Sequence, residues 1–333
     1  MPVILGIESS CDDTSAAVYS DGVMLSNIIA NQAIHEAYGG VVPELASRVH
    51  QQNIVPAVQQ ALINAKIRKN DIDAVAFTRG PGLLGSLLVG VSFAKAFALA
   101  KNLPLIEVNH MQAHILAHFI DDPKPTFPFI CLTVSGGHTQ IVLVKDYFDM
   151  EIIGHTQDDA AGEAMDKTSK ILGLPYPGGP LIDKYARLGN PDAFPFPEPQ
   201  IPGYNFSFSG LKTSILYFIQ NNVAKNPAFI AENLNDICAS VEKRIVTILL
   251  NKLTKAVLAY GIKDVALAGG VSANTGLRLG LQELGAKHVW NTFIPAMQYC
   301  TDNAGMIAVA GYYKYLQGDF TDQHVAPLAR MPF

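Results

Sequence analysis

Hydrophobic and polar residues alternate along this chain in a pattern that occurs twice. Apolar residues at 3–7 lead into a polar turn and a second apolar run at 15–19, and the runs at 129–134 and 140–144 flank a glycine turn in the same way. Short apolar runs bounded by polar or glycine turns are typical of strands. We therefore predict one β-hairpin in each half of the chain.

A second repeated pattern follows each hairpin. Residues 72–108 predict a strand to 77, a glycine loop, a helix to 101 and a strand from 105. A strand at 265–268 begins the second copy, with a loop at 269–274, a helix through 284 and a strand near 288–290. This order is typical of a βαβ unit with parallel strands. We predict an α/β fold of two related lobes facing each other across a cleft, produced by duplication.

An insertion at residues 146–225, rich in Gly, Pro, Asp and Phe, separates the second hairpin from its βαβ unit. Such stretches tend to be loops that line sites. A helical pattern within it predicts an ion pair between Asp166 and Lys170. The lobes are then expected to be residues 1–124 with about 305–333, and residues 125–304.

Composition indicates a cytosolic, enzyme-sized protein. The 333 residues are 49% hydrophobic and 16% charged, with a formal charge of -5. This argues against a generally basic nucleic-acid binder, so any polyanion contact must come from partner proteins or a small cluster such as Lys66, Arg68 and Lys69. Four cysteines without CxxC spacing indicate reduced thiols. The apolar stretch at 83–100 is interrupted by Gly, Ser and Lys, which disfavours a membrane span.

His110 and His114 stand four residues apart, so both imidazoles share one face if the segment is helical. That is metal-ligand spacing, although an apolar helix carrying histidines would look the same. Met111 stands where zinc proteases of the His-Glu-x-x-His type carry their general base. His118 is a third candidate, but three ligands from one helix rarely surround a metal. Asp302 is the more interesting one, with a helix N-cap or first-turn acid as its alternative role.

Glycine turns supply candidate nucleotide contacts. The turn at 135–139 suits a phosphate, and a plain hairpin turn explains it equally well. The loop at 269–274 leads into a helix, so it could bind an adenosine, with Asn274 as the hydrogen-bonding residue at its tip. Alternatively, Asn274 is an ordinary helix N-cap. Asp12 and Asp13 are adjacent carboxylates in the first turn, where solvent or a bound cation would relieve their repulsion.

Taken together, these motifs resemble the TsaD family, the bacterial tRNA threonylcarbamoyladenosine transferases once labelled glycoproteases and related to the catalytic subunit of the archaeal and eukaryotic KEOPS complex. The resemblance follows the family's order over nearly the whole chain. The segments that carry it are residues 6–14, 109–114, 134–139, 158–167, 176–180, 205–213 and 268–274.

The resemblance implies the actin-like ATPase (ASKHA) fold of sugar kinases and heat-shock chaperones. It also implies transfer of the threonylcarbamoyl group from threonylcarbamoyl-AMP to the N6 amine of adenosine 37 in tRNAs reading ANN codons. The implied metal ligands are His110, His114 and Asp302, holding Fe²⁺ or Zn²⁺. The implied substrate contacts, for an adenine nucleotide in the cleft, are Thr133, Val134, Ser135, Gly136, Gly137, Asp166, Gly179, Asp183 and Asn274.

The partners follow from the same resemblance, whereas the catalytic role is our own hypothesis. The family enzyme works with tRNA, a paralogous pseudo-enzyme (TsaB) that forms a heterodimer with it, and a small P-loop ATPase (TsaE). Our hypothesis for the carboxylate that orients or deprotonates the acceptor amine is Asp12. A metal-dependent endopeptidase, disfavoured by Met111, and a nonenzymatic ATP-binding regulator are the alternatives.

Three positions depart from the family pattern. Asp13 stands where the family carries Glu, which shortens its reach by one methylene. Met165 replaces a common Phe, which we expect to change packing alone. Thr133 stands where archaeal relatives carry a Tyr ligand, so no tyrosinate is expected at the metal and the bacterial branch is favoured.

Overall fold

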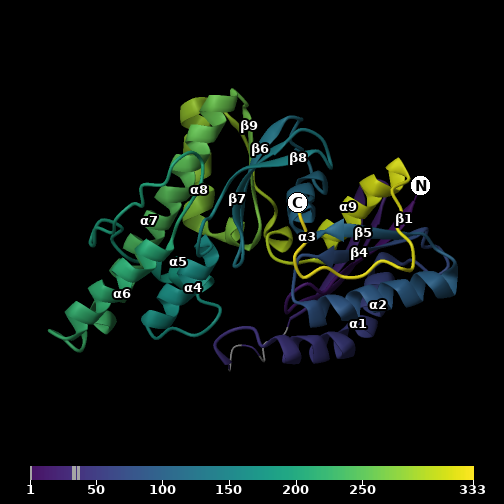
Figure 1. Ribbon diagram of the computed structural model, residues 1–333, viewed down its shortest axis with the longest axis horizontal. Helices are drawn as coiled ribbons and strands as arrows, with labels where there is room; N and C mark the ends of the chain where they lie inside the picture. The colour runs from purple at the N-terminus through teal and green to yellow at the C-terminus, as the bar shows by residue number, and fades with distance from the viewer. Residues whose placement is uncertain (1, 32–34, 36–37) are drawn as a thin grey trace. The chain divides into compact units, whose positions relative to one another are not determined.

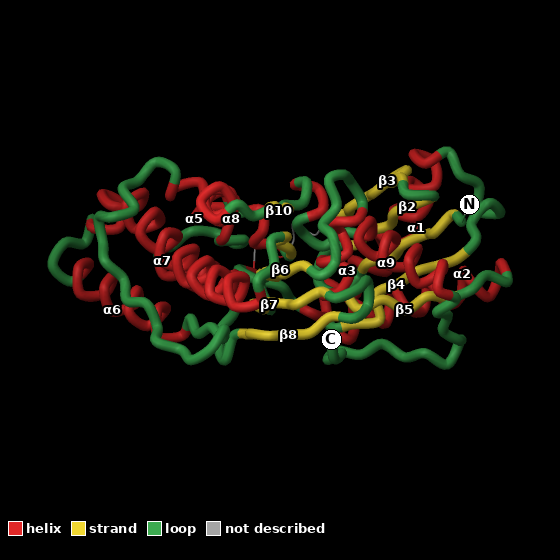
Figure 2. The backbone as a smooth tube through the Cα atoms, turned by 90° about the horizontal axis from the view of Figure 1, so that it is seen from above, coloured by secondary structure: helices red, strands yellow, loops and turns green. Residues whose placement is uncertain are grey.

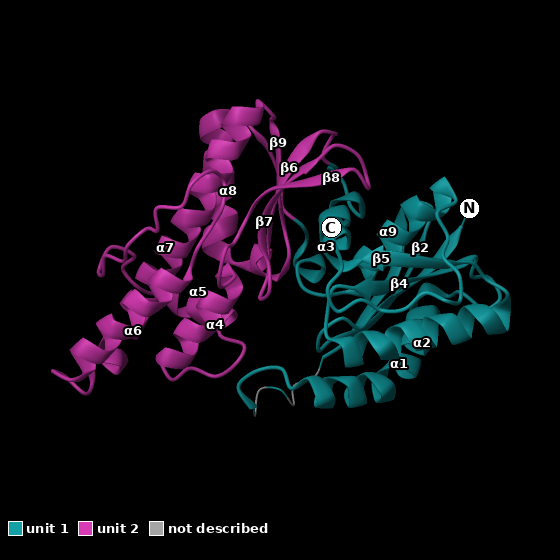
Figure 3. Cartoon of the chain, viewed as in Figure 1, with its two compact units in different colours: residues 1–124, 295–333 teal, residues 125–294 magenta. Residues whose placement is uncertain are grey.

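The computed structural model describes residues 2–31, 35 and 38–333, and the chain divides into two compact units (Figure 3). Unit 1 comprises residues 1–124 and 295–333, and unit 2 comprises residues 125–294. Unit 2 thus ends before the boundary near residue 304 that we drew from the sequence. Asp302 therefore belongs to the same unit as His110 and His114.

Unit 1 is built on a five-stranded mixed sheet in the order β3-β2-β1-β4-β5. The central strand β1 pairs antiparallel with β2 and parallel with β4, and its residues 4–8 are buried. Central strands covered on both faces need near-continuous apolar sequence, which β1 and β4 have. The strands are β1 (Val3–Glu8), β2 (Thr14–Ser20), β3 (Val23–Ala30), β4 (Ala74–Gly80) and β5 (Leu105–Asn109).

Helices cover both faces of this sheet (Figure 1). They are α1 (Pro43–Ala65), α2 (Leu84–Lys101), α3 (His110–Leu116) and α9 (Ala304–Gln317), with short 3₁₀ turns η2 (Ala117–Phe119) and η4 (Met297–Tyr299). Gly6 lets α9 lie directly on β1, because a Cβ there would meet the Ala304 carbonyl oxygen at 2.5 Å. Helix α2 is long and apolar enough to cross a membrane by length and composition alone, and it packs against α1 and β4.

Unit 2 repeats the same sheet. Its order is β10-β9-β6-β7-β8, with β6 antiparallel to β7 and parallel to β9, as β1 is to β2 and β4. This equivalence of order and direction confirms the predicted duplication. The strands are β6 (Phe129–Val134), β7 (Thr139–Val144), β8 (Met150–His155), β9 (Asp264–Ala268) and β10 (Asn291–Phe293).

The core of unit 2 lies between the sheet and its helices, drawn in red in Figure 2. Ile130 and Leu132 of β6 belong to the same buried cluster as Leu249 of α7 and Leu281 of α8. The helices are α4 (Ala161–Ile171), α5 (Gly179–Ala186), α6 (Ser209–Val223), α7 (Phe229–Tyr260) and α8 (Thr275–His288), with a 3₁₀ turn η3 (Gly270–Ala273).

Two local predictions were wrong. The last strand lies at 291–293 and not near 288–290, because α8 continues to His288 and Val289 closes it in the left-handed conformation, with φ of 58°. The Trp290 amide then donates to the Gly285 carbonyl at 2.9 Å. The insertion at 146–225 is also more regular than expected, since it contains β8, α4, α5 and α6.

Candidate functional site

The two histidines lie where β5 passes directly into α3. Asn109 ends the strand and caps the helix, since its side-chain oxygen accepts from the amides of Met111 at 2.9 Å and Gln112 at 3.2 Å. Capping by Asn satisfies amides that an α-helix leaves open at its start. Both His110 and His114 are buried, and their ring centroids are 4.7 Å apart. The predicted helical placement of the pair is confirmed.

Asp302 reaches the histidines from the turn before α9. The N-cap of α9 is its neighbour Asn303, whose side chain accepts from the Met306 amide at 3.1 Å. Asp302 is therefore free of the capping role that was its alternative. Its Oδ1 lies 3.2 Å from His114 Nε2 and 3.4 Å from His110 Nε2.

These three ligand atoms are arranged as a metal site requires. His110 Nε2 and His114 Nε2 are 3.2 Å apart, so all three separations fall between 3.2 and 3.4 Å. Such spacing suits three ligands each about 2.0–2.2 Å from one ion. The three residues form a group that could hold a metal ion, and His118 is not part of it. The other ring nitrogen of His114, Nδ1, is buried and has no hydrogen-bond partner among the described residues.

Glu8 is a site residue that our sequence analysis missed. Its carboxylate is fully buried at the end of β1, 3.0 Å from His110 Nδ1, and accepts from the Thr78 hydroxyl at 2.7 Å. A carboxylate on the far nitrogen of a ligand histidine fixes the ring's orientation and tautomer. Glu8 therefore directs His110 Nε2 toward Asp302. The sequence feature that could have identified Glu8 is its position as a charged residue at the end of an otherwise apolar strand.

The site is strongly polarised by its buried charges. Burial disfavours a charged His110, but the Asp302 and Glu8 carboxylates outweigh it and raise the pKa of His110 well above its usual value. Burial dominates at His114 and lowers its pKa. Despite burial, the adjacent His110 lowers the pKa of both carboxyl groups, Glu8 and Asp302. Two ionised carboxylates facing two imidazoles form an environment that favours a cation.

The first turn, with Asp12 and Asp13, lies in the same unit. Its backbone is held by α1 and α2, since the Cys11 carbonyl oxygen lies 3.0 Å from both His50 Nε2 and the Ser86 hydroxyl. Burial, followed by repulsion from Asp12, Asp302 and Glu8, raises the pKa of Asp13 to about 7. A carboxylate with a pKa near the working pH is suited to proton transfer.

The other predicted residues lie in unit 2 in separate groups, and the first group is the glycine turn after β6. Ser135 closes this turn with His138, whose carbonyl oxygen accepts from the Ser135 amide at 2.8 Å. A Cβ on Gly136 or Gly137 would meet no heavy atom within 4 Å, so both glycines border open space. Gly162, in the first turn of α4, lies so close that its Cβ would be 2.6 Å from the Ser135 carbonyl oxygen. The N-terminal end of α4 thus approaches the turn.

Thr133 and Val134 stay predicted contacts, and a ligand would reach them through their backbone atoms because their side chains are enclosed. Both are fully buried in β6. Of the predicted run 133–137, Gly136 and Gly137 are exposed and border open space, and Ser135 is partly buried.

Asp166 holds the loop that begins α5. Its Oδ1 accepts from the Gly178 amide at 2.8 Å and the Gly179 amide at 3.0 Å. The predicted Asp166–Lys170 pair is therefore wrong, because the carboxylate turns toward backbone amides instead. Lys167 forms the ion pair of this helix, with Glu163 at 2.8 Å.

Asp183 and Asn274 meet around Glu242 of α7, a second residue that the sequence analysis missed. Asn274 caps α8 by accepting from the Leu277 amide at 2.8 Å, and its amide donates to Glu242 Oε1 at 2.5 Å. Asp183 accepts from the Thr275 hydroxyl at 3.1 Å and pairs with Arg187. Burial and then the Asp183 charge raise the pKa of Glu242 to about 7, although the Asn274 hydrogen bond and Arg187 oppose this.

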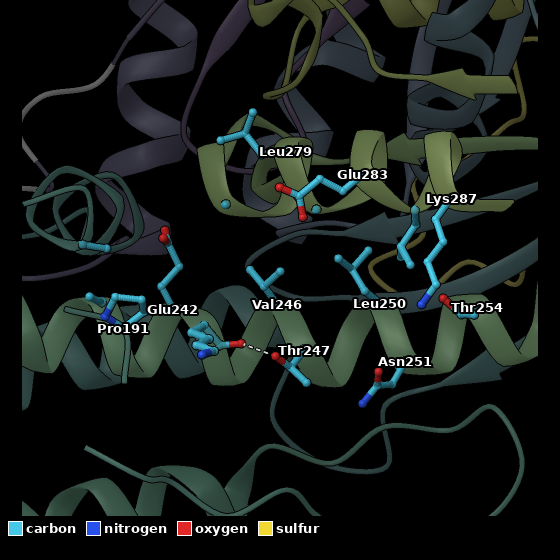
Figure 4. A pocket seen from close by; sticks show the side chains of 16 residues that line it. Pro191, Glu242, Val246, Thr247, Leu250, Asn251, Thr254, Leu279, Glu283 and Lys287 are labelled. Atoms are coloured by element: carbon cyan, nitrogen blue, oxygen red, sulfur yellow. Dashed lines mark hydrogen bonds between the residues drawn. The ribbon is translucent and has the colours of Figure 1, made fainter. Parts of the chain in front are cut away.

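A groove of about 590 Å³ runs between α7 and α8, with Glu242 at its edge (Figure 4). Apolar side chains such as Val246, Leu250 and Leu279 line its length. Charged side chains also line it, namely Lys243, Glu283 and Lys287, so the groove is open and mixed in character. The groove begins next to Asn274, because Gly276 also lines it.

Comparisons with solved structures identify the fold. Full-length HypF in a phosphate- and nucleotide-bound form matches 96% of this chain and 56% of its own, with a TM-score of 0.63 and 14% identity. The ROK hexokinase of Thermus thermophilus matches 95% of this chain and 100% of its own, with a TM-score of 0.52 and 15% identity. At such identities the likeness shows the fold alone. The chain thus has the actin-like ATPase fold, with a His-His-Asp group in unit 1 that could hold a cation.

Sequence relatives identify the family. The Cytophaga hutchinsonii tRNA N6-adenosine threonylcarbamoyltransferase is 61% identical over 98% of this chain and 96% of its own length. The Christiangramia forsetii enzyme of the same name is 62% identical over 99% and 98%. The profile of the TsaD family, tRNA N6-adenosine threonylcarbamoyltransferase, matches residues 23–309. The chain belongs to the TsaD family, which confirms the predicted family and acyltransferase class over the peptidase and regulator alternatives.

Proposed function

We propose that this chain transfers the threonylcarbamoyl group from threonylcarbamoyl-AMP to the N6 amine of adenosine 37 in tRNAs that read ANN codons. The observation that carries the proposal is family membership over nearly the whole chain, at 61–62% identity to two relatives with this named activity. The acceptor amine is a weak nucleophile and AMP is a good leaving group. Positioning and electrostatics are therefore the expected sources of rate.

The proposed metal site is His110, His114 and Asp302, with Fe²⁺ as the preferred ion and Zn²⁺ as the alternative. A bound ion with open coordination positions would polarise and template the threonylcarbamoyl carbonyl groups. The three residues would hold and orient that ion, and Glu8 would keep the proton of neutral His110 on Nδ1, which leaves Nε2 for the ion. Support comes from the 3.2–3.4 Å separations of the three ligand atoms.

The proposed adenylate contacts are all in unit 2. The 135–137 turn would hold the phosphate, with the amides of Gly136 and Gly137 donating to its oxygens, because glycine allows these oxygens to approach the backbone closely. Asp183 and Asn274 would orient the adenosine, with Asp166 keeping Gly179 in place. Support comes from the open space beside Gly136 and Gly137 and from the groove that begins next to Asn274.

Asp12 is our proposed residue for orienting or deprotonating the acceptor amine, and Asp13 is its competitor. The raised pKa of Asp13, about 7, supports the competitor. Asp12→Asn and Asp13→Asn form a matched pair that separates the two. Loss of transfer in Asp12→Asn with normal adenylate binding supports our assignment, and the reverse pattern transfers the role to Asp13.

We further propose that the chain acts in the cytoplasm with tRNA, a TsaB-type paralogue as heterodimer partner and a TsaE-type P-loop ATPase. The formal charge of -5 supports the proposal that partners supply part of the tRNA-binding surface, because tRNA is a polyanion.

The test is to incubate the purified chain with labelled threonylcarbamoyl-AMP and tRNA, with and without both partners, and to identify the modified nucleoside by mass spectrometry. We expect threonylcarbamoyladenosine at position 37. Cleavage of a protein substrate that disappears in His110→Ala would support the endopeptidase instead. Nucleotide binding without transfer, even with both partners present, would support the regulator.

A further inference from the structure

The last residues of the chain form a strap along unit 1, which we define as residues 320–332. The strap begins beside β5, where the Thr321 amide donates to the Leu105 carbonyl at 2.9 Å. It then passes α2, since the Lys95 ammonium donates to the Val325 carbonyl at 3.0 Å. Figure 1 draws this segment in yellow, running along β4 and β5. Its backbone is therefore held by hydrogen bonds along its length.

The strap next completes the loop after β4. The Leu328 amide donates to the Arg79 carbonyl at 2.8 Å, and the Gly82 amide donates to the Ala329 carbonyl at 3.2 Å. Gly80 has no room for a Cβ, because the Leu328 carbonyl oxygen occupies that space. The loop and the strap are thus packed backbone against backbone, which fixes the path of the strap toward β5.

The strap ends on the residue that starts the histidine helix. The Asn109 side-chain amide donates to the Pro332 carbonyl at 2.8 Å, while its oxygen caps α3. Asn109 is only 4% exposed, so water does not easily replace either bond. An Asn side chain carries a donor and an acceptor on one rigid plane, and both are used here. This single side chain connects the strap to the first turn of α3, where His110 lies.

We infer that the strap is a clamp that fixes the start of α3 and thereby the positions of His110 and His114. Asn109 is the positioning residue that connects the strap to α3. The inference rests on the proposed metal site and is independent of the transfer reaction. Asn109 does not bond to a ligand side chain and would act on His110 and His114 through the backbone of α3, whose first amides it accepts from. Releasing the clamp should let a bound ion leave faster without removing any ligand.

Two variants break the same contact from its two sides. Asn109→Ser keeps a good N-cap but is too short to reach the strap. Deletion of Pro332 and Phe333 removes the acceptor carbonyl and leaves Asn109 intact. Gln323→Ala is the control, because it removes a strap bond to the Lys95 carbonyl, away from Asn109.

The experiment loads the full-length variants with Zn²⁺ and follows its release to a chromogenic chelator. We expect at most about tenfold faster release from Asn109→Ser and from the deletion, since tenfold is the smallest usual effect of a direct hydrogen-bond partner of a ligand and this contact is indirect. The double variant should be no faster than either, because both changes break one contact. Gln323→Ala should match the wild type. Hydrogen exchange should accelerate in α3 and not in β1, which distinguishes clamp release from general loosening.

The results decide the inference as follows. Faster, non-additive release supports the clamp. Wild-type release from Asn109→Ser, or additive effects in the double variant, overturns it. If the deletion does not fold, Asn109→Ser alone decides in the same way. If the wild type and His114→Ala bind Zn²⁺ equally well, the proposed metal site itself fails, and the clamp fails with it.

Discussion

Glu8 is a buried carboxylate that contacts a proposed metal ligand, His110, without belonging to the proposed ligand set. Its carboxylate lies on the nitrogen of His110 opposite to Asp302, so the ring is held between two acceptors. A fully buried carboxylate is costly unless it is hydrogen-bonded and charge-compensated, and Thr78 and His110 provide both here. This cost indicates that Glu8 has a positioning role.

Glu8→Gln should therefore weaken metal binding while leaving the three ligands in place. Gln can occupy the same volume, but it supplies no charge to favour the required state of His110. We expect a 10- to 100-fold loss of Zn²⁺ affinity, the usual effect of removing such a partner. Competition with a chelating dye measures it. Thr78→Val, which removes the other side-chain partner of Glu8, should give a smaller loss, and equal affinity of Glu8→Gln and wild type would contradict the role.

Glu242 offers a second prediction at this scale, based on its pKa. Burial and Asp183 raise this pKa from 4.5 to about 7, so the folded state holds a proton that the unfolded state has already released. Stability contributed by that proton is present below about pH 4.5 and is lost as the pH rises toward 7. Glu242→Gln should reduce this pH-dependent loss of stability, because Gln does not titrate.

Urea denaturation at pH 5 and pH 8 measures the effect. The midpoint of the wild type should fall more between these two pH values than the midpoint of Glu242→Gln. Glu283→Gln is the control, since it changes an exposed carboxylate that lines the same groove. An equal fall of the urea midpoint between pH 5 and pH 8 in all three proteins would contradict the raised pKa of Glu242.

Secondary-structure elements carry the site residues to their places through close backbone packing. Helix α9 lies on β1 at Gly6, where an added Cβ would meet the Ala304 carbonyl oxygen at 2.5 Å and the Ala308 amide nitrogen at 2.8 Å. Asp302 lies just before this helix. The height of α9 above the sheet thus sets the distance between Asp302 and the histidines of α3.

Gly6→Ala should push α9 away from β1 and destabilise the fold by about 1–3 kcal/mol, the usual cost of overpacking. It should also weaken Zn²⁺ binding, because Asp302 moves with the helix. Gly210→Ala is the control, since a Cβ there would meet no heavy atom within 4 Å and alanine favours the α6 helix. Urea denaturation with and without Zn²⁺ measures both effects, and equal stability of the two variants would count against the packing argument.

Prediction from sequence worked best where spacing within one element carried the information. The His110–His114 pair, the hairpins and the glycine loops follow from local patterns. Glu8 could not be placed, because its role depends on β1 lying beside β4 and on β5 leading into α3. The α8 boundary was wrong for a related reason: Val289 adopts a left-handed conformation that β-branched residues rarely take, so its sequence indicated a strand.

At the scale of the whole molecule, the proposed sites divide between the two units. Residues His110, His114 and Asp302 are all in unit 1, although Asp302 is 188 positions from His114 in the sequence. Ser135, Asp183 and the other adenylate contacts are in unit 2. Each duplicated unit thus has its own proposed ligand, which is consistent with two copies of one fold having diverged in their chemistry.

Hydrogen exchange should therefore report the two ligands in different units. Zn²⁺ should slow exchange in α3 and at the start of α9, because it ties these segments together. ATP or ADP should slow exchange at the 135–137 turn and at the start of α8. Protection of unit 2 segments by Zn²⁺ in a protein carrying His114→Ala would contradict this division, since no ion should then be held in unit 1.

The central claim is that the His-His-Asp group serves transfer of threonylcarbamoyl to tRNA. Its most direct test measures labelled threonylcarbamoyl moved from its adenylate to tRNA by His114→Ala and by His118→Ala, with metal and both partners present. His118 is the matched control, because it is also a buried histidine and lies outside the ligand group. We predict transfer by the wild type and by His118→Ala, and loss of transfer in His114→Ala. Transfer by His114→Ala at the wild-type rate would contradict the account.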